Sequence, residues 1–369
     1  MVAEIFLAFI ILFAVLTFVI ENITNFRQPL GYETEQLWVA GLVLRDTDST
    51  EVISIKDNLR RELNAHPKVE NVSFGSFMSP LGNSQNMYGN DDMSFQVFSH
   101  LFDADENFAT TAGVEVTQGR WFSDEDAGGK YPPMVISEKL YKDYFEGRPV
   151  LDSVISMAGE HKVVGMVKNF NYLGKFAEEV PISFRMVTSD EEEVSSLYIR
   201  LREGVGIEFE EELTRLISDV SKLDYVTLEQ IEQRVQRDNR VTFVPMIAMI
   251  SISGFLIINV ALGLFGVLWY NISQRRGEIG LRRAIGAYKS HIMIQFVAEI
   301  LLITFFGMLL ALLFCVQVPL MDFTEIKDTY LYQAMTYSFI FITVLVLICA
   351  LYPSQQAARI APAEALHAE

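Results

Sequence analysis

The chain has 369 residues, of which 50% are hydrophobic and 21% are charged, and its formal net charge is −18. Its positive mean hydropathy excludes an ordinary soluble protein, and its charged fraction excludes a chain that lies wholly within a bilayer. We therefore expect the sequence to divide between lipid and water.

Four apolar stretches are long enough to cross the hydrocarbon core of a bilayer, which is about 30 Å thick. The first span is assigned to residues 1–20, with its apolar run starting at Ala3. No Lys or Arg precedes it and no small-residue cleavage pattern precedes Glu21, so we expect a membrane anchor rather than a cleaved secretory signal. The other predicted spans are 242–270, 292–318 and 331–352.

Basic residues indicate which side of the membrane is cytoplasmic, because short loops rich in Lys and Arg are retained there. The loop 271–291 has one acid, Glu278, and the cations Arg275, Arg276, Arg282, Arg283 and Lys289. The other short loop, 321–330, is mainly acidic. This asymmetry predicts a multi-pass protein with both termini cytoplasmic and with residues 21–241 extracytoplasmic.

The outer region, residues 21–241, holds about −17 of the net charge of −18. Such an acidic surface argues against nucleic acid or anionic lipid as a ligand of this domain. The need to keep an exported domain soluble explains the same acidity, so the charge alone does not identify a ligand.

Strand and helix patterns alternate at both ends of the outer domain. The predicted strands are 36–44, 69–74, 196–201 and 224–228, with one helix between the first two and another, 207–220, between the last two. Two such halves predict a split ferredoxin-like subdomain with an insertion at about 79–187. Short strands and one helix, 138–145, predict that the insertion is mostly β. The predicted fold is an extracytoplasmic α+β domain joined to four transmembrane α-helices.

A helical pattern at about 228–241 leads into the second span, with Leu228, Ile231 and Val235 on one face. We predict a rigid stalk helix that carries motion across the membrane surface. An amphipathic helix packed on its own domain explains the same spacing, and both interpretations stay open.

Motifs in several parts of the chain match a known pattern. They are RRGEIGLRRAIGA at 275–287; Phe296, Glu299 and Gly307 in the third span; Pro353, Ala357, Ala358, Arg359, Pro362, Ala365 and Leu366 in the tail; and Gly119, Arg120, Trp121 and Phe122, with VVGMV at 163–167 and Phe170, in the outer domain. With the layout of one span, an outer domain and three further spans, they make the chain similar to the FtsX-like and MacB-like permeases of ATP-binding cassette (ABC) systems. Family members usually begin with a basic amphipathic helix, so either the start is shortened or this branch lacks it.

The resemblance implies a non-catalytic permease subunit in the bacterial inner membrane. Residues 21–241 would be the MacB-like periplasmic core domain and 242–369 the FtsX-like permease domain, with 353–369 as its cytoplasmic tail. The sequence has no GxxxxGK[ST] phosphate loop, so this chain is expected to hold no cofactor, and ATP and Mg would be bound by a partner ATPase in two copies. The other implied partners are a second permease subunit in a homodimer or heterodimer, membrane lipid, and a periplasmic adaptor or outer-membrane factor.

The implied function is to couple ATP hydrolysis to movements of the outer domain, which exports or extracts a hydrophobic or amphipathic substrate. The alternative is an FtsX-like regulatory or sensing subunit that controls a cell-wall hydrolase or an antimicrobial-peptide response. Copurification with an adaptor would favour transport, and copurification with a hydrolase or a histidine kinase would favour regulation.

The loop between the second and third spans is the candidate docking element. Its apolar and basic groups can form a short helix with ends at Gly277 and Gly286, and in the family such a coupling helix seats in a cleft of the ATPase. The docking residues carried over are Arg275, Glu278, Ile279, Leu281, Arg282 and Ala284. The alternative is that the arginines only fix the topology and contact lipid headgroups, since charge fits both interpretations.

Polar and small residues within the spans are further candidates. Asn259, Gly263 and Gly266 form a small polar stripe suited to close helix packing, either in a dimer or within the chain. Glu299 lies about two turns into the third span, where a carboxylate is costly unless it is paired. We expect it to bond a neighbouring helix or an arginine of the loop.

No catalytic or metal site is expected. The five histidines do not pair with one another or with cysteine at metal-ligand spacing, and no GxSxG elbow occurs. Cys315 and Cys349 are both predicted inside the membrane near opposite faces, too far apart for a disulfide.

Overall fold

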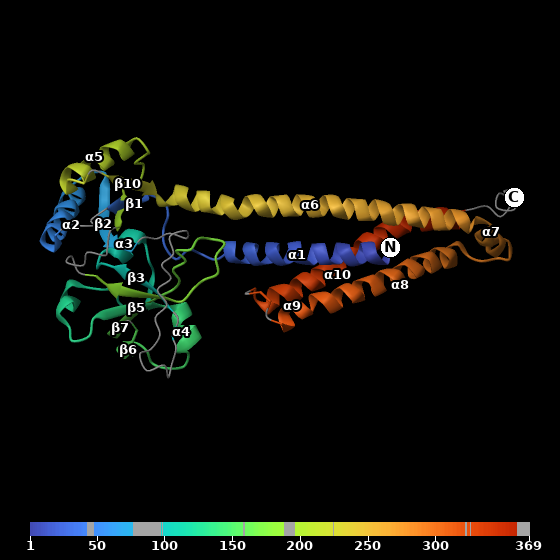
Figure 1. Ribbon diagram of the computed structural model, residues 1–369, viewed down its shortest axis with the longest axis horizontal. Coiled ribbons are helices and arrows are strands. Elements are labelled where there is room, and N and C mark those ends of the chain that lie inside the picture. The colour runs from blue at the N-terminus through green and yellow to red at the C-terminus, as the bar shows by residue number, and fades with distance from the viewer. Residues whose placement is uncertain are drawn as a thin grey trace. The chain divides into compact units, whose positions relative to one another are not determined.

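The computed structural model describes residues 1–42, 48–76, 97, 99–157, 159–187, 196–223, 225–321, 323–324 and 326–359. The chain divides into two compact units (Figure 1). One unit comprises residues 25–242, and the other comprises 1–24 together with 243–369. The two units are taken in turn.

The unit 25–242 contains the predicted split ferredoxin-like subdomain, which is confirmed. Its elements are β1 (Leu37–Leu42), α2 (Ser49–Asn64), β2 (Val69–Gly75), β9 (Ser196–Leu201), α5 (Phe209–Ser221) and β10 (Val226–Gln230). The strand order is β10-β1-β9-β2 and every neighbouring pair is antiparallel. Both helices pack into one core with the sheet, so the two β-α-β halves close over a single hydrophobic layer (Figure 1).

Strand β1 is apolar throughout because both of its faces are covered. Trp38 and Ala40 point into the core under α2 and α5, whereas Leu37 and Val39 point into a second core on the other side. Successive side chains of a strand point to opposite faces, so a strand buried on both faces needs a continuous apolar run rather than an alternating one.

The insertion continues the same sheet. Its elements are β3 (His100–Ala104), α3 (Phe108–Ala112), β4 (Val116–Gly119), the 3₁₀ turn η1 (Asp124–Gly128), β5 (Pro133–Ser137), α4 (Glu138–Tyr144), β6 (Val154–Ser156), β7 (Glu160–Val167) and β8 (Ile182–Met186). The order continues as β3-β8-β5-β7-β4, with β6 beside β7. Its mostly β character and its predicted helix, α4, are confirmed. Helix α3 was not predicted, because its five residues are too few to show a helical pattern. The start of the predicted insertion at about 79 lies outside the described residues.

Two glycines explain the GRWF and VVGMV motifs of the outer domain. Gly119 and Gly165 are paired across β4 and β7. A Cβ on Gly165 would lie 2.1 Å from the carbonyl oxygen of Arg120, and a Cβ on Gly119 would lie 2.3 Å from that of Val164. Gly119 also has a φ of +70°, which side chains rarely tolerate. The glycine in each motif therefore allows the backbones of β4 and β7 to approach closely.

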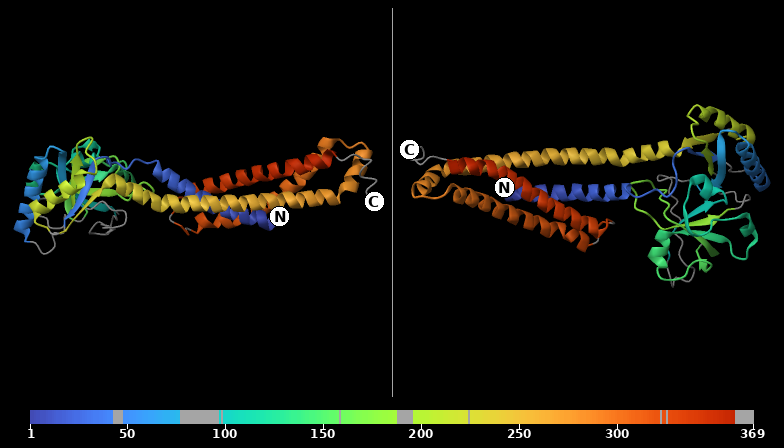
Figure 2. Two further views of the ribbon diagram at one scale, coloured as in Figure 1. Left: turned by 90° about the horizontal axis from the view of Figure 1, so that it is seen from above. Right: turned by 180° about the vertical axis from the view of Figure 1, so that it is seen from behind.

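The other unit is helical. Its helices are α1 (Val2–Phe26), α6 (Ile231–Gln274), α7 (Arg276–Ala284), α8 (Lys289–Cys315), α9 (Gln317–Leu320) and α10 (Asp328–Arg359), the first two of which also extend into the unit 25–242. Four segments, namely α1, α6, α8 continued by α9, and α10, are long and apolar enough to cross a membrane, which confirms the four predicted spans. Helices α8 and α10 run side by side (Figure 2).

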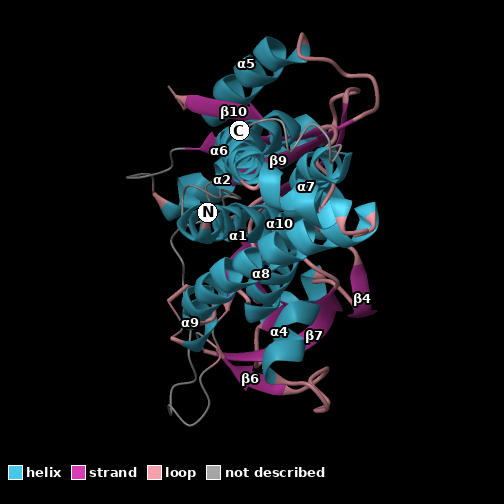
Figure 3. Cartoon of the chain, turned by 90° about the vertical axis from the view of Figure 1, so that its right-hand side faces the viewer, coloured by secondary structure: helices cyan, strands magenta, loops and turns pink. Residues whose placement is uncertain are grey.

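Helix α1 packs closely against α8 and α10. Ile5 and Phe9 of α1 share a buried core with Ile300 and Met308 of α8, and the end-on view shows the three helices grouped together (Figure 3). A Cβ on Gly307 would lie 3.2 Å from both the Ile5 side chain and the Val2 carbonyl oxygen. The glycine of the third-span motif thus lets α1 approach α8.

Two predicted boundaries differ from the structure. The stalk helix was expected from about 228, but Leu228 belongs to β10 and α6 begins at Ile231. Ile231 is buried in the outer-domain core, and Val235 packs against it, as the interpretation of a packed amphipathic helix requires. The helix then continues without interruption to Gln274, as a stalk requires. At the other end, helix α10 extends through Pro353 to Arg359, and the rest of the predicted tail lies outside the described residues.

Candidate functional site

The loop between the second and third spans forms helix α7, the predicted short helix. Arg275 separates α7 from α6, and its N–H bonds the carbonyls of Asn271 and Ile272, each at 3.2 Å. Gly286 follows the helix with a φ of +100°, so it ends α7 as predicted. Gly277 does not mark the start, because α7 already begins at Arg276.

One side of α7 is buried against the ends of its neighbours. Ile279 is 3% exposed and packs with Ile272 of α6 and with Ile292 and Phe296 of α8. These four side chains form a small apolar cluster at the end of the bundle. Ile279 was carried over as a docking residue, but its side chain is occupied within the chain.

The opposite side of α7 leaves large apolar groups exposed. Leu281 is 54% exposed, Ile285 is 78% exposed and Tyr288 is 73% exposed. Ala284 lies exposed among them. We call Leu281 and Ala284 of α7, together with Ile285 and Tyr288 of the turn that follows it, the outward face of α7. Contiguous exposed apolar groups beside charged residues mark interaction surfaces.

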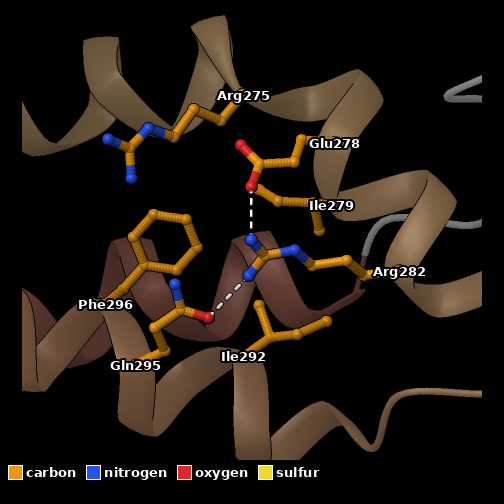
Figure 4. Close-up of a pocket in the computed structure, with 7 residues that line it drawn as sticks. All are labelled: Arg275, Glu278, Ile279, Arg282, Ile292, Gln295 and Phe296. Atoms are coloured by element: carbon orange, nitrogen blue, oxygen red, sulfur yellow. Dashed lines mark hydrogen bonds and ion pairs between the residues drawn. The ribbon is translucent and has the colours of Figure 1, made fainter.

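Between the two sides, polar residues of α7 face α8 around a pocket. Four of the six predicted docking residues line it, namely Arg275, Glu278, Ile279 and Arg282, together with Ile292, Gln295 and Phe296 of α8 (Figure 4). Arg282 donates from Nη1 to Gln295 Oε1 at 2.8 Å, and its Nη2 bonds Glu278. The structure therefore separates the predicted set into four residues that line this pocket and two, Leu281 and Ala284, that do not.

Glu299 of α8 is paired, as expected from its place in a span. Arg275 Nη1 donates to Glu299 Oε2 at 3.1 Å, and Gln295 Nε2 donates to Glu299 Oε1 at 3.0 Å. The predicted bond to an arginine of the loop is confirmed. Gln295 was missed, although its position one helical turn before Glu299 places it on the same face of α8.

The predicted stripe on α6 is divided between two environments. A Cβ on Gly263 would lie 3.7 Å from Glu4 Oε1 of α1, so this position faces a neighbouring helix. Asn259 is exposed and donates to the Phe255 carbonyl of its own helix at 2.8 Å, and Gly266 is exposed as well. A packing role for Asn259 and Gly266 stays a prediction.

Metal-binding chemistry finds no support in the described part of the chain. Over those residues, no three His, Cys, Asp or Glu side chains come together as ligands for a metal ion. Cys315 and Cys349 are both free.

Two family profiles match the chain. The MacB-like periplasmic core domain matches residues 5–216, and the FtsX-like permease C-terminal domain matches residues 250–362. The first profile alone covers more than half of the chain.

Curated relatives are ABC transporter proteins of bacteria. The macrolide export ATP-binding/permease protein MacB 1/2 of Paracoccus denitrificans (strain Pd 1222) is 28% identical over 218 residues, which cover 55% of this chain and 31% of that protein. The uncharacterized ABC transporter permease YknZ of Bacillus subtilis (strain 168) is 23% identical over 210 residues, covering 55% of this chain and 52% of that protein. The matches span about half or less of these relatives.

A solved structure with a similar domain is the periplasmic region of MacB from Actinobacillus actinomycetemcomitans. It aligns with a TM-score of 0.40 and 14% identity, and the alignment covers 58% of this chain and 97% of that one.

Proposed function

The chain belongs to the family of FtsX-like and MacB-like permeases of ABC transporters, and from this premise we propose that it is a permease subunit driven by a separate ATPase. The observation that carries the proposal is the outward face of α7, where Leu281, Ile285 and Tyr288 are each more than half exposed. The absence of a phosphate loop from the sequence supports placing ATP and Mg in a partner chain.

The outward face of α7 suits docking into a groove. Amphipathic helices bind partners by laying apolar side chains at neighbouring turns into a hydrophobic cleft. Leu281 and Ile285 are spaced by four residues, so both point to the same side. Basic residues at both ends of the loop would hold α7 at the cytoplasmic surface, where an ATPase is accessible.

In this arrangement both termini are cytoplasmic, and residues 25–242 act outside the inner membrane. A permease dimer with two ATPases would use ATP hydrolysis to move the outer domains. The name of the MacB relatives, macrolide export proteins, supports export or extraction of a hydrophobic or amphipathic substrate. A periplasmic adaptor or outer-membrane factor would extend that path.

The outward face of α7 is tested by removing two of its side chains. The chain is tagged in its native host, purified with Leu281→Ala and Ile285→Ala combined, and assayed for co-eluting ATP hydrolysis. Burying each of these side chains is worth about 1.5–3 kcal/mol, so the double variant should lose co-eluting activity by at least about tenfold.

The matched control combines Leu302→Ala and Ile294→Ala, which remove equally exposed side chains of α8, 59% and 60% exposed. This control should keep its ATPase activity. Wild-type activity in the Leu281→Ala, Ile285→Ala variant would overturn the docking proposal, as would a wild-type preparation that brings down no protein with a phosphate loop.

A further inference from the structure

Helices α7 and α8 are joined by a continuous chain of side-chain hydrogen bonds. Starting from Glu278, the chain runs through Arg282 and Gln295 to Glu299 and ends at Arg275. Figure 4 shows its first two bonds, from Arg282 to Glu278 and to Gln295. Both Oε atoms of Glu299 accept bonds, both polar atoms of the Gln295 amide are used, and both Nη atoms of Arg282 donate. We call these five residues the ladder.

The ladder and the apolar cluster together hold α7 against α8. The pocket lined by four of the ladder residues, all but Glu299, is also lined by Ile279, Ile292 and Phe296, which are buried. Apolar contacts alone are not directional and tolerate rotation or sliding of a short helix. Hydrogen bonds are directional, so a chain of four of them that includes two ion pairs favours one orientation of α7 on α8.

The position of Glu299 makes this orientation costly to lose. It lies ten residues after the first residue of α8, which is about 15 Å along the helix, within the apolar span. A carboxylate at that depth is expensive unless it is paired. If α7 turned or moved away, Arg275 and Glu299 would both lose their ion-pair partner.

We propose that Arg275, Gln295 and Glu299 are positioning residues that lock α7 onto α8, so that the outward face is presented to the ATPase and its movement is passed to the third span. This inference rests on the proposed docking function. It also divides the residues carried over from the family. Glu278, Ile279 and Arg282 act by holding α7, whereas Leu281 and Ala284 touch the partner.

The lock is tested by neutralising its charges singly and together in the purified full-length protein. Hydrogen–deuterium exchange of residues 276–284 reports the opening of α7 without any partner present. Glu299→Gln and Arg275→Gln should each speed this exchange by about three- to fivefold, because each breaks a half-exposed ion pair and leaves the other charge unpaired. The combined variant leaves two neutral amides that can bond each other, so its exchange should return to within about twofold of the wild type.

The ATPase activity that co-elutes with these variants should follow the same pattern, with loss in each single variant and recovery in the combined one. Recovery of ATPase activity in the combined variant separates a positioning role from direct contact. If Arg275 touched the ATPase, changing Glu299 as well would not restore the activity that is lost in Arg275→Gln. Arg276→Gln is the control for exchange, since it removes an exposed neighbouring cation outside the ladder.

The outcomes distinguish the lock from docking itself. Unchanged exchange in Glu299→Gln, or a combined variant that exchanges as fast as the single ones, overturns the lock even if Leu281→Ala with Ile285→Ala abolishes ATPase coupling. Faster exchange in the single variants with undiminished ATPase activity overturns the positioning role. If Leu281→Ala with Ile285→Ala also leaves that activity unchanged, the docking function fails as well.

Discussion

Arg120 of the GRWF motif forms an ion pair with Asp126. Arg120 donates from Nη1 and Nη2 to the two carboxylate oxygens at 2.6 and 2.7 Å, and Ser123 donates from its N–H and its hydroxyl at 3.0 and 3.1 Å. The hydrogen bond from Arg120, followed by smaller contributions, lowers the pKa of Asp126 from 3.8 to about 2.

The sign of the resulting pH dependence follows from that direction. A carboxyl whose pKa is lower in the folded state adds stability above about pH 4 and loses that contribution as the pH falls towards 2. Asp126→Asn should therefore lower the unfolding temperature at pH 7. It should also make the unfolding temperature fall less steeply between pH 4 and pH 2 than it does in the wild type. Differential scanning fluorimetry of the outer domain's unfolding in the full-length protein measures both effects. Glu125→Gln, at an exposed neighbour, should keep the wild-type fall of the unfolding temperature between pH 4 and pH 2. The same wild-type fall in Asp126→Asn would contradict the prediction.

The sequence located this motif but not its geometry. The GRWF residues could be matched to a family pattern, yet the paired approach of Gly119 and Gly165 depends on β4 and β7 becoming neighbours. That pairing joins segments far apart in the chain, which local periodicity does not specify. Gln295 was missed for a related reason, because a polar residue in a span gains a role only when α7 folds back onto α8.

Among the elements, the connection between β2 and β3 is the weakest part of the sheet. Among the described residues, the two strands share one paired position, Gly75 with Ala104. The carboxylate of Asp105, just after β3, reinforces it by accepting from the Phe74 N–H at 2.7 Å and from the Ser73 hydroxyl at 2.6 Å. The two halves of the outer sheet thus depend on a buried side chain at their junction.

Arg60 of α2 holds that junction from the other side. It donates to Asp105 at 2.7 Å and to Glu106 at 2.6 Å. Arg60→Met should destabilise the outer domain by about 3 kcal/mol, because it leaves a buried carboxylate without its partner. Urea unfolding of the full-length protein, followed by Trp fluorescence, measures the loss.

The loss of stability in Arg60→Met should depend on pH. Burial raises the pKa of Asp105 to about 6, and Arg60 opposes that shift. Without Arg60 the carboxyl should take up a proton more readily, which removes the unpaired charge. The defect should therefore be smaller at pH 5 than at pH 8, and an equal or larger defect at pH 5 would contradict it. Arg61→Met, on the same helix but with its side chain 71% exposed, is the matched control.

Element prediction from the sequence succeeded where period and length agree. The apolar run at β1, the helical spacing of α5 and the four long hydrophobic stretches each have one interpretation, and the structure contains all of them. The stalk helix was also predicted to run into the second span, as Ile231–Gln274 does, but its start was placed at about 228, in residues that form the end of β10. That helix carries a residue buried in the outer-domain core, Ile231, and another, Ile272, buried beside α7. The residues buried near its two ends therefore belong to different units of the chain.

For the whole molecule, the orientation in the membrane decides whether the docking of an ATPase is possible. The docking proposal needs α7 inside the cell and residues 25–242 outside, as the cations of the 271–291 loop predict. Single cysteines introduced at open glycines test this in a background with Cys315→Ala and Cys349→Ala. Gly128 and Gly277 are suitable, because a Cβ at either position meets no atom within 4 Å.

Gly128→Cys should react with a membrane-impermeant maleimide in intact spheroplasts, and Gly277→Cys should react only after the membrane is opened. The cysteine-free background controls for labelling of other proteins, and the same reagent applied to opened membranes shows that both sites are reactive. The reverse pattern would place α7 outside the cell, beyond the reach of any ATP-binding partner. Since the outward face, the ladder and the stalk helix all derive their proposed roles from that partner, such a result would overturn the coupling mechanism and leave only the fold and the family.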